Sequence, residues 1–544
     1  MKILIIVPKY AYYKITTQKN YHYHVPIGLG YIISVLKKAG HNVDSLNLNH
    51  KDGKVKELIT IALNKKQYDF VATGHSGIGY QMVEKILDAV NNHKTKPKTI
   101  IGGSLITSEP VLMINSLKPD YAVIGEGEET IVELLDFIEK NKDLNRVRGI
   151  AYKSQDKKNS PKYIFTELRE PIMDLDSIPF PDFEAMELNE KLDNMDSGDD
   201  LFSLMDYPRT YPIIGSRGCP FQCTFCYRIL GNKYRIRSSD NIIKELEFAI
   251  KKYNINSFNL LDDLFASNKA RLNEFCAKLE KLNKKYSVNL KWFCSLWVST
   301  LDEETLLILK KAGCLGIGLG FESYSPVVLK SMKKFITPQQ IDNAIKLCWK
   351  VHMPFLGNFI FGDVAETKET AKETLDYWKN HCKDQVKLFF IPPYPNSEIY
   401  QHCVREGIIK DRLDFIKNKI HHTNIINMTD KMTESEFNEL KKKIFAFTAR
   451  YSNYVVPFKI KKTLKKDVYD IYVVCPFCKK ISVHKNHGLL SKYYYHDHPH
   501  CRNCGMRYHI ASPLYKFTIE HYLALDFLRK NYLRFHDMLL KSRL

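Results

Sequence analysis

The sequence predicts an α/β protein with an N-terminal doubly wound parallel sheet, a central partial (β/α)6 barrel, a C-terminal helical segment and a small four-cysteine module. Three observations support this prediction. Short apolar strands alternate with amphipathic helices up to about residue 400, which is typical of parallel sheets covered by helices. The chain has 544 residues, more than one hydrophobic core normally serves. Seven of its 13 cysteines stand in tight clusters.

Five segments follow from these patterns. We expect a doubly wound domain at 1–150, a linker at 151–204, a partial barrel at 205–400, a helical cap segment at 401–466, and the four-cysteine module with a C-terminal helix at 467–544.

Composition narrows the class of protein. Hydrophobic residues make up 44% and charged residues 26%, ordinary values for a soluble globular protein. The apolar runs are too short for a transmembrane segment, and the N-terminus lacks a signal-peptide cleavage site, so we expect a cytoplasmic location. The net charge of +20 would suit an anionic partner, but the lysines are scattered, so nucleic acid is not otherwise indicated. Clustered cysteines in the cytoplasm indicate metal or redox chemistry rather than disulfides.

In the N-terminal region, glycine-bearing loops follow three successive predicted strands. The strands are predicted at 2–7, 42–48, 70–76, 98–104 and 121–128, and helices at 28–40, 80–93 and 129–140. Ligands of such sheets bind beyond the carboxyl ends of the strands, and glycine lets a ligand approach the backbone closely. The glycines concerned are Gly74, Gly77, Gly102, Gly103, Gly125 and Gly127. A flavodoxin-like domain that binds another nucleotide, or nothing, remains the alternative.

The stretch "GCPFQCTFCYR" holds Cys219, Cys223 and Cys226 within eleven residues. A [4Fe–4S] cluster has four irons and normally takes four thiolates, so three cysteines leave one iron open for another ligand. A zinc knuckle is the alternative, but no fourth cysteine or histidine follows nearby. The sequence therefore favours an open iron–sulfur site.

Six strand segments flank and follow this loop, at 211–219, 258–265, 290–297, 314–323, 355–362 and 386–395. Six such units with helices between them make an open barrel, whose functional residues stand at the carboxyl ends of the strands. The stretch "GLGFES" places Glu322 at such an end.

These motifs resemble one known family. Cys-x3-Cys-x2-Cys is the signature of radical SAM enzymes, and "VPIGLGYIISVLKKAGHNV", "IIGGS" and "VIGEGEET" resemble the cobalamin-binding domain of the cobalamin-dependent members. The resemblance implies a [4Fe–4S] cluster, S-adenosyl-L-methionine (SAM) and cobalamin as cofactors. It also implies an electron donor such as flavodoxin or ferredoxin. The activity that we expect is methyl transfer to an unactivated carbon through a 5′-deoxyadenosyl radical. Ring formation, rearrangement or a non-catalytic metal-binding scaffold remain alternatives, and the substrate could be a small molecule, lipid, sugar or peptide.

The resemblance also implies roles for single residues. Phe225 matches the aromatic position near the adenine, and Glu322 matches a carboxylate that contacts the SAM amino group or ribose. Segments that match those supporting SAM contain Gly318, Gly320, Gly357, Gly362 and Glu366. Asp262 and Asp263 fall where the family often carries acidic residues near the active site. Ser76, Gly77, Gly102, Gly103, Gly125 and Glu126 would lie along the cobalamin. The Asp-x-His-x-x-Gly motif of other cobalamin proteins is absent, so no histidine ligand to cobalt is expected. No general base can be assigned.

The C-terminal region combines an amphipathic helix, a basic run at 459–466 that reads as a linker, and two Cys-x2-Cys turns. Cys475, Cys478, Cys501 and Cys504 have the spacing of a zinc ribbon, whose two turns supply four thiolates to one ion. A rubredoxin-like iron would use the same ligands. The surrounding histidines are expected at the surface or facing substrate: His484, His487, His496, His498, His500 and His509.

Overall fold

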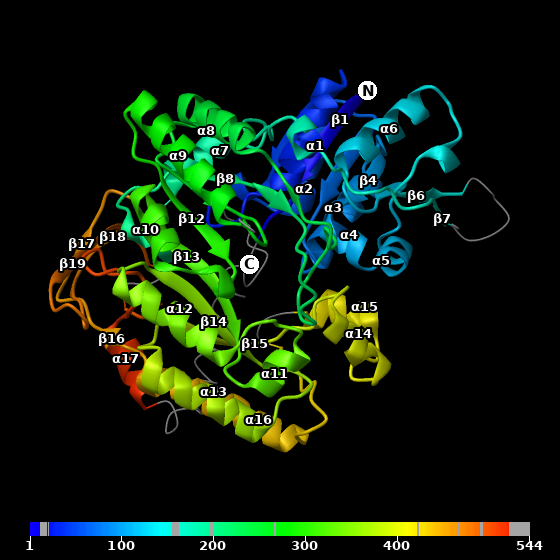
Figure 1. Ribbon diagram of the computed structural model, residues 1–544. Coiled ribbons are helices and arrows are strands. Elements are labelled where there is room, and N and C mark those ends of the chain that lie inside the picture. Colours follow the sequence, from blue (N-terminus) through cyan, green and yellow to red (C-terminus); the bar gives the residue numbers. More distant parts are fainter. Residues whose placement is uncertain are drawn as a thin grey trace. The chain divides into compact units, whose positions relative to one another are not determined.

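The structure is a computed structural model that describes residues 1–10, 19, 21–154, 163–195, 200–265, 268–420, 424–465, 467–489 and 493–521 (Figure 1). The chain forms two compact units, each assembled from separate segments. Unit 1 comprises Met1–Asn194, Ser216–Asn241 and Pro392–Asn424, and unit 2 comprises Met195–Gly215, Ile242–Ile391 and Ile425–Leu544. Among the helices in the described part of the chain, none is long and apolar enough to cross a membrane.

Unit 1 is built on a seven-stranded sheet in the order β2-β1-β3-β4-β5-β6-β7. Its strands are β1 (Lys2–Val7), β2 (Asn42–Asn47), β3 (Phe70–Gly74), β4 (Lys98–Gly102), β5 (Tyr121–Val123), β6 (Ile150–Lys153) and β7 (Tyr163–Phe165). The first five are parallel, and β6 and β7 add to the edge in antiparallel fashion. The order 2-1-3-4-5 is that of doubly wound sheets, which bind ligands where the winding reverses, between β1 and β3. The predicted parallel sheet is confirmed, and the two antiparallel edge strands were not predicted.

Helices cover both faces of this sheet (Figure 1). The helices of unit 1 include α1 (Ile27–Lys38), α2 (Val55–Lys65), α3 (Tyr80–Asn91), α4 (Ser104–Ser108), α5 (Pro110–Leu117), α6 (Glu128–Glu139) and α7 (Leu188–Asn194). Because side chains alternate along a strand, Leu4 and Ile6 of β1 pack with Ile59 of α2 and Ile86 of α3. Ile5, which points the opposite way, is equally buried on the other face. The near-continuous apolar run of β1 is therefore the mark of a strand covered on both sides.

Unit 2 contains a six-stranded parallel sheet in the order β15-β14-β13-β12-β11-β8. Its strands are β8 (Thr210–Ile213), β11 (Ser257–Leu260), β12 (Lys291–Leu296), β13 (Cys314–Glu322), β14 (Phe355–Phe361) and β15 (Val386–Phe390). The helices between and after them are α8 (Ser239–Tyr253), α9 (Lys269–Tyr286), α10 (Glu303–Lys311), α11 (Pro326–Ser331), α12 (Pro338–Lys350), α13 (Lys368–His381) and α16 (Glu434–Tyr451). Each of the six predicted strands is present, and the predicted partial (β/α)6 barrel is confirmed.

The two faces of this second sheet differ in burial. Along β12, Trp292, Cys294 and Leu296 are buried, whereas the alternating Phe293 and Ser295 are half-exposed. Strands β13 and β14 continue the alternation. These interior strands of the sheet therefore have one buried and one more accessible face.

The C-terminal part of unit 2 forms a small module of two three-stranded sheets. They contain β17 (Lys459–Lys462), β18 (Val468–Val474) and β19 (Ile481–Gly488), and β16 (Tyr454–Val455), β21 (His509–Ala511) and β20 (His496–Asp497). Ile471, Val473, Tyr508 and Ile510 pack in its core. Strand β17 occupies half of the expected basic linker. Of the predicted C-terminal helix, α17 (Pro513–Glu520) is described, and the remainder lies outside the described residues.

Candidate functional site

The three cysteines of the first cluster lie in one loop of unit 1. This triad loop, residues 218–234, connects β9 (Ser216–Arg217) to β10 (Arg235–Ile236), which pair in antiparallel fashion. Gly218 has a φ of +76°, and a Cβ there would lie 2.5 Å from the Lys233 carbonyl oxygen. Glycine is therefore required where the loop leaves β9. Within the loop, Cys226 donates its backbone N–H to the carbonyl of Cys223 at 3.2 Å.

The triad does not have the arrangement of a site for a single metal ion. Among the described residues, ligand atoms gather within 4.8 Å of one another in two groups, and the triad is in neither. This fits a cluster, because each thiolate of a [4Fe–4S] centre binds a different iron and the sulfurs stand apart. Cys223 is buried, while Cys219, Cys226 and Phe225 are half-buried, so the loop keeps an accessible side.

The strand-end glycines of unit 1 fall into two kinds. A Cβ at Gly77 would lie 2.8 Å from the Tyr227 hydroxyl, which donates to the Ser104 carbonyl at 2.9 Å. A Cβ at Gly103, where φ is +85°, would lie 3.0 Å from the His75 carbonyl oxygen. Gly102 and Gly125, by contrast, have room for a Cβ. Gly77 and Gly103 thus serve the packing of the protein itself, whereas close packing does not require glycine at Gly102, and Gly125 is favoured by its φ of +87° alone.

His75 follows β3 at the point where the winding of the sheet reverses. Its ring stacks on Tyr10, with centroids 4.3 Å apart, and its Nδ1 lies 3.1 Å from the hydroxyl of Ser76. Burial lowers the pKa of His75 to about 4. The imidazole is therefore neutral at physiological pH, and the Ser76 hydroxyl is already engaged by it.

In unit 2, Glu322 ends β13 with a φ of +62°, an uncommon backbone conformation for a residue with a side chain. Its carboxylate accepts a hydrogen bond from Lys334 Nζ at 3.0 Å, and both side chains are buried. Lys334 also lies over the Trp297 ring, 4.5 Å from its centroid. A Cβ at Gly320 would lie 2.2 Å from the Glu322 carboxylate and 2.8 Å from Lys334 Nζ. The glycine leaves the space that this ion pair occupies.

A second buried carboxylate follows β14. Glu366 accepts from the backbone N–H of Gly362 at 2.8 Å, and the Gly362 φ of +99° turns the chain toward it. Burial raises the pKa of Glu366 to about 8, so the carboxyl group is mainly protonated at neutral pH. Its backbone carbonyl accepts from the Thr429 hydroxyl at 2.9 Å. This turn is thereby held rigid within unit 2.

The acidic pair after β11 has two different environments. Asp262 is buried and accepts from the backbone N–H of Gly215 at 2.6 Å, while Arg271 donates to the Gly215 carbonyl at 2.8 Å. Asp262 therefore fixes the chain just after β8. Asp263 is exposed to solvent, yet desolvation by the surrounding protein raises its pKa. Of the two, Asp263 has the accessible carboxylate.

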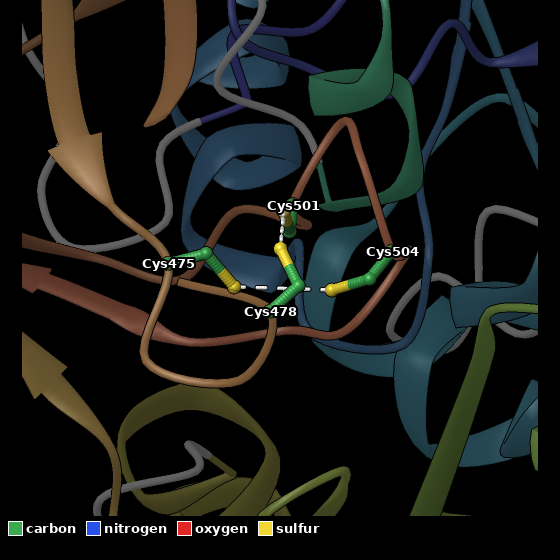
Figure 2. Close-up of side chains that lie close together, drawn as sticks. All are labelled: Cys475, Cys478, Cys501 and Cys504. Atoms are coloured by element: carbon green, nitrogen blue, oxygen red, sulfur yellow. Dashed lines mark hydrogen bonds between the residues drawn. The ribbon is translucent and has the colours of Figure 1, made fainter. Parts of the chain in front are cut away.

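The four C-terminal cysteines converge (Figure 2). Their sulfur atoms all lie within 4.8 Å of one another, with Cys475 Sγ 3.8 Å from Cys504 Sγ and Cys478 Sγ 3.8 Å from Cys501 Sγ. Four thiolates arranged as a tetrahedron at about 2.3 Å from a zinc ion would be about 3.8 Å apart. The donor set and its geometry therefore fit a single tetrahedral ion.

The two turns that carry these cysteines have the same backbone. In one, the N–H of Phe477 donates to Cys475 Sγ, and in the other the N–H of Asn503 donates to Cys501 Sγ, both at 3.4 Å. The residue after each second cysteine has positive φ, +60° at Lys479 and +72° at Gly505. N–H groups that point at sulfur favour the thiolate form, which a metal needs.

The module contacts the rest of unit 2 at residues that precede barrel strands. Arg507 donates its N–H to Gln385 Oε1 at 2.7 Å, and a Cβ at Gly505 would lie 2.8 Å from Pro354. Arg502 bonds the Met205 carbonyl at 2.9 Å. Gln385, Pro354 and Met205 come before β15, β14 and β8, so the module covers the N-terminal rim of the barrel. Functional residues of such barrels stand at the opposite rim.

The expectation of exposed or substrate-facing histidines is wrong for most of them. His484, His487, His500 and His509 are buried, and His496 and His498 are half-buried. His484 lies 2.6 Å from the Tyr508 hydroxyl, and His509 Nε2 lies 3.1 Å from Asp384. Burial lowers the pKa of both His484 and His496 to about 3, so the two rings stay neutral. These rings are internal hydrogen-bonding groups of the module.

The sequence did not predict three charged residues that lie beside Glu322 or beside the triad loop. Lys334 pairs with Glu322, while Arg217 and Arg235 flank the triad loop and pair with Glu126. Both arginines sit within twelve residues of the cysteines, and this proximity was the one available signal. For Lys334 the sequence offers no signal, because a lone lysine among many is ordinarily solvated.

Known protein families match both the N-terminal and the central part of the chain. The family model for the radical SAM superfamily matches residues 213–377, and the model for the B12 binding domain matches residues 13–135. An uncharacterized methyltransferase of Pyrococcus horikoshii is 29% identical over 71% of this chain and 79% of its own length. The anaerobic magnesium-protoporphyrin IX monomethyl ester cyclase of Rubrivivax gelatinosus is 26% identical, over 74% of this chain and 70% of its own.

Among solved structures, the fold is similar to that of the radical SAM methyltransferase TsrM from Kitasatospora setae, with a TM-score of 0.58. That comparison covers 75% of this chain and 77% of the other, at 16% identity.

Proposed function

The chain belongs to the cobalamin-dependent radical SAM enzymes, and from this premise we propose that it transfers a methyl group to an unactivated carbon of its substrate. The observation that carries the proposal is the similarity to a methyltransferase across both the B12 binding and the radical SAM segments. When bound, the [4Fe–4S] cluster, SAM and cobalamin supply the radical and the methyl group. The protein's own residues must bind these groups, orient them and exclude water.

The triad loop would bind the cluster through Cys219, Cys223 and Cys226. The glycine required at 218 supports this assignment, as does the finding that the three cysteines are not gathered around a single-ion site. Phe225, half-buried in the same loop, would line the adenine.

On the barrel, Glu322 would receive the SAM amino group. Lys334 donates a hydrogen bond to this carboxylate and fixes its direction, and Gly318 and Gly320 carry no side chain on β13. Glu366 and Gly362 would support the neighbouring turn rather than touch the reacting atoms. Asp263, with its accessible carboxylate and raised pKa, is the candidate to exchange a proton with substrate.

Cobalamin would lie over the strand ends of unit 1, along Gly102 and Gly125, where a Cβ would have room. His75 is buried against Tyr10 and bonded to Ser76, which supports a cobalt without a histidine ligand. Gly77, Gly103 and Ser76 would shape the site from behind.

The four-cysteine module would hold one zinc ion in a structural role. Its four sulfurs complete the tetrahedral shell, so no position is left open for catalysis. Its contacts with residues before β8, β14 and β15 support a function in closing the barrel rim rather than in binding substrate. We further propose a cytoplasmic enzyme that takes electrons from a flavodoxin or ferredoxin and acts on a small molecule.

Isotope transfer tests the proposed reaction. Anaerobic, reconstituted enzyme is incubated with SAM carrying a deuterated methyl group, cobalamin, a reductant and fractionated cell extract, and products are analysed by mass spectrometry. A methyltransferase forms S-adenosylhomocysteine, 5′-deoxyadenosine and a product with three deuterium atoms. A cyclase, the alternative that the Rubrivivax relative favours, forms 5′-deoxyadenosine and an unlabelled product, which would overturn the proposal.

A further inference from the structure

Unit 1 contains a cluster of four buried charges that lies directly beside the triad loop. Arg217 reaches Glu126 at 3.0 Å and Glu128 at 2.5 Å, and Arg235 reaches both oxygens of Glu126 at 2.7 and 2.9 Å. Their side chains are at most 8% exposed, and that of Arg235 is 1% exposed. Two positive and two negative groups are thus removed from water together.

The two arginines stand at the two ends of the triad loop. Arg217 is the second residue before Cys219, and in the antiparallel pair of β9 and β10 it lies directly opposite Arg235. Like charges in directly opposed positions of a sheet destabilise the pairing. The loop can therefore close at its base only when carboxylates lie between the two guanidinium groups.

Both carboxylates come from the third strand-end loop of unit 1, where cobalamin contacts were expected. Glu126 follows β5 and the positive-φ Gly125, and Glu128 is the first residue of α6. Glu126 also accepts from the N–H of Ile172 at 2.7 Å, while Arg235 donates to the Ile172 carbonyl at 2.8 Å. Both oxygens of Glu126 are thus committed to groups of the protein, which leaves no free acceptor for a nucleotide.

Burying these four charges carries a large desolvation free energy. Desolvation raises the pKa of Glu126, and the hydrogen bond from Arg235 with the charge of Arg217 outweighs that effect, so its pKa is lowered overall. Buried ion pairs are often no more stabilising than apolar residues of similar size, but they fix one arrangement of their partners. Register and position are what such a cluster determines best.

We propose that Glu126 and Glu128, through Arg217 and Arg235, are positioning residues that fix the triad loop to the β5–α6 turn, so that cobalamin bound at this turn orders the cluster ligands. The inference rests on the proposed cofactor assignments. It replaces the expected contact between Glu126 and cobalamin by an indirect role. It also gives the two cofactors a coupling of binding free energies, which must be reciprocal.

The test compares two matched variants on helix α6 and the turn before it. Glu126→Gln keeps the shape of the side chain and removes the charge between the two arginines. Glu133→Gln makes the same change in the ion pair of Glu133 with Arg169, which involves neither arginine of the triad loop. Iron content, the electron paramagnetic resonance spectrum of the reduced cluster, and hydrogen exchange at 216–236 are measured with and without hydroxocobalamin.

In the unaltered protein, hydroxocobalamin should slow exchange at 216–236. Glu126→Gln should speed this exchange by at least about tenfold, change the spectrum and remove the response to hydroxocobalamin. The metal of the four-cysteine module should be retained. Glu133→Gln should behave like the unaltered protein.

The proposal is overturned if Glu126→Gln keeps the normal exchange and response, or if Glu133→Gln disturbs them equally. If Glu126→Gln does not fold, the double variant Glu126→Gln/Arg235→Met, which removes one charge of each sign, should fold but lack the response. Retention of the response in that variant also overturns the proposal. A failure of the cofactor assignment itself looks different, because the unaltered protein would then hold no iron at the triad.

Discussion

The two cysteine clusters of this chain use the same ligand atom in opposite ways. In the C-terminal module, four sulfurs converge within 4.8 Å on two turns of equal backbone. In the triad loop, three cysteines that do not form such a group stand on a single loop whose base is closed by buried charges. A complete shell needs only local turns, because the metal itself holds them together. An incomplete shell must be positioned by the rest of the protein, and the surroundings of the triad loop supply that positioning.

Removal of the triad should distinguish the two cysteine clusters by the largest effect. Replacing Cys219, Cys223 and Cys226 by Ala should remove the iron of the cluster, about four atoms per chain, and abolish 5′-deoxyadenosine formation. Metal analysis should still find about one ion per chain, bound by the other cluster. Cys348→Ala, in the buried face of α12, is the control and should keep both metals. Formation of 5′-deoxyadenosine by the triple variant would disprove the assignment.

Breaking the other cluster should affect stability instead of chemistry. Cys478→Ser should release the ion and lower the free energy of unfolding of unit 2 by at least about 3 kcal/mol. Differential scanning calorimetry should report a fall in Tm of roughly 5–10 °C. Hydrogen exchange should rise near Pro354 and Gln385, where the module meets the barrel rim. Hydroxocobalamin binding should be unchanged, and a selective loss of turnover with normal stability would indicate a catalytic metal.

A smaller change tests how strictly the triad loop is shaped. Gly218→Ala places a Cβ 2.5 Å from a carbonyl oxygen at positive φ, so the loop should be strained by about 2–3 kcal/mol and iron content should fall. Gly231→Ala is the matched control, since its φ is also positive but no atom lies within 4 Å of the added Cβ. It should cost about 1 kcal/mol and keep its iron. Equal iron loss in both variants would mean that backbone conformation alone, rather than contact, limits the loop.

The smallest predicted effect concerns the paired turns of the module. Lys479→Gly relieves a positive φ and should raise stability by about 0.5 kcal/mol. Gly505→Ala should lower the stability by more than this gain, because the new Cβ contacts Pro354 and alanine is also disfavoured at the positive φ. Chemical denaturation of the two variants in parallel measures both signs. Opposite signs would show that the turns are alike in backbone and unlike in surroundings.

Sequence alone predicted the elements whose pattern is local. The strands of both parallel sheets and the two cysteine clusters follow from apolar periodicity and ligand spacing. Strands β6 and β7 were missed because their edge position needs no continuous apolar run. The burial of His484 and His509 was missed because it depends on packing between β19, β21 and Asp384, which are distant in sequence. Lys334 and the arginines of the triad loop were missed for the same reason.

Unit 1 is discontinuous along the chain, and this has a consequence for synthesis. The segment Ser216–Asn241, which contains the triad loop, and the segment Pro392–Asn424 both belong to it, while five of the six barrel strands are encoded between them. The backbone of Thr224 in the triad loop accepts a hydrogen bond from Ile399 at 3.0 Å. On the ribosome, the triad loop must therefore wait for about 175 further residues after Thr224 before this partner emerges. Iron–sulfur assembly factors would meet an unfinished loop during that interval, so cluster delivery is expected to follow the emergence of Pro392–Asn424.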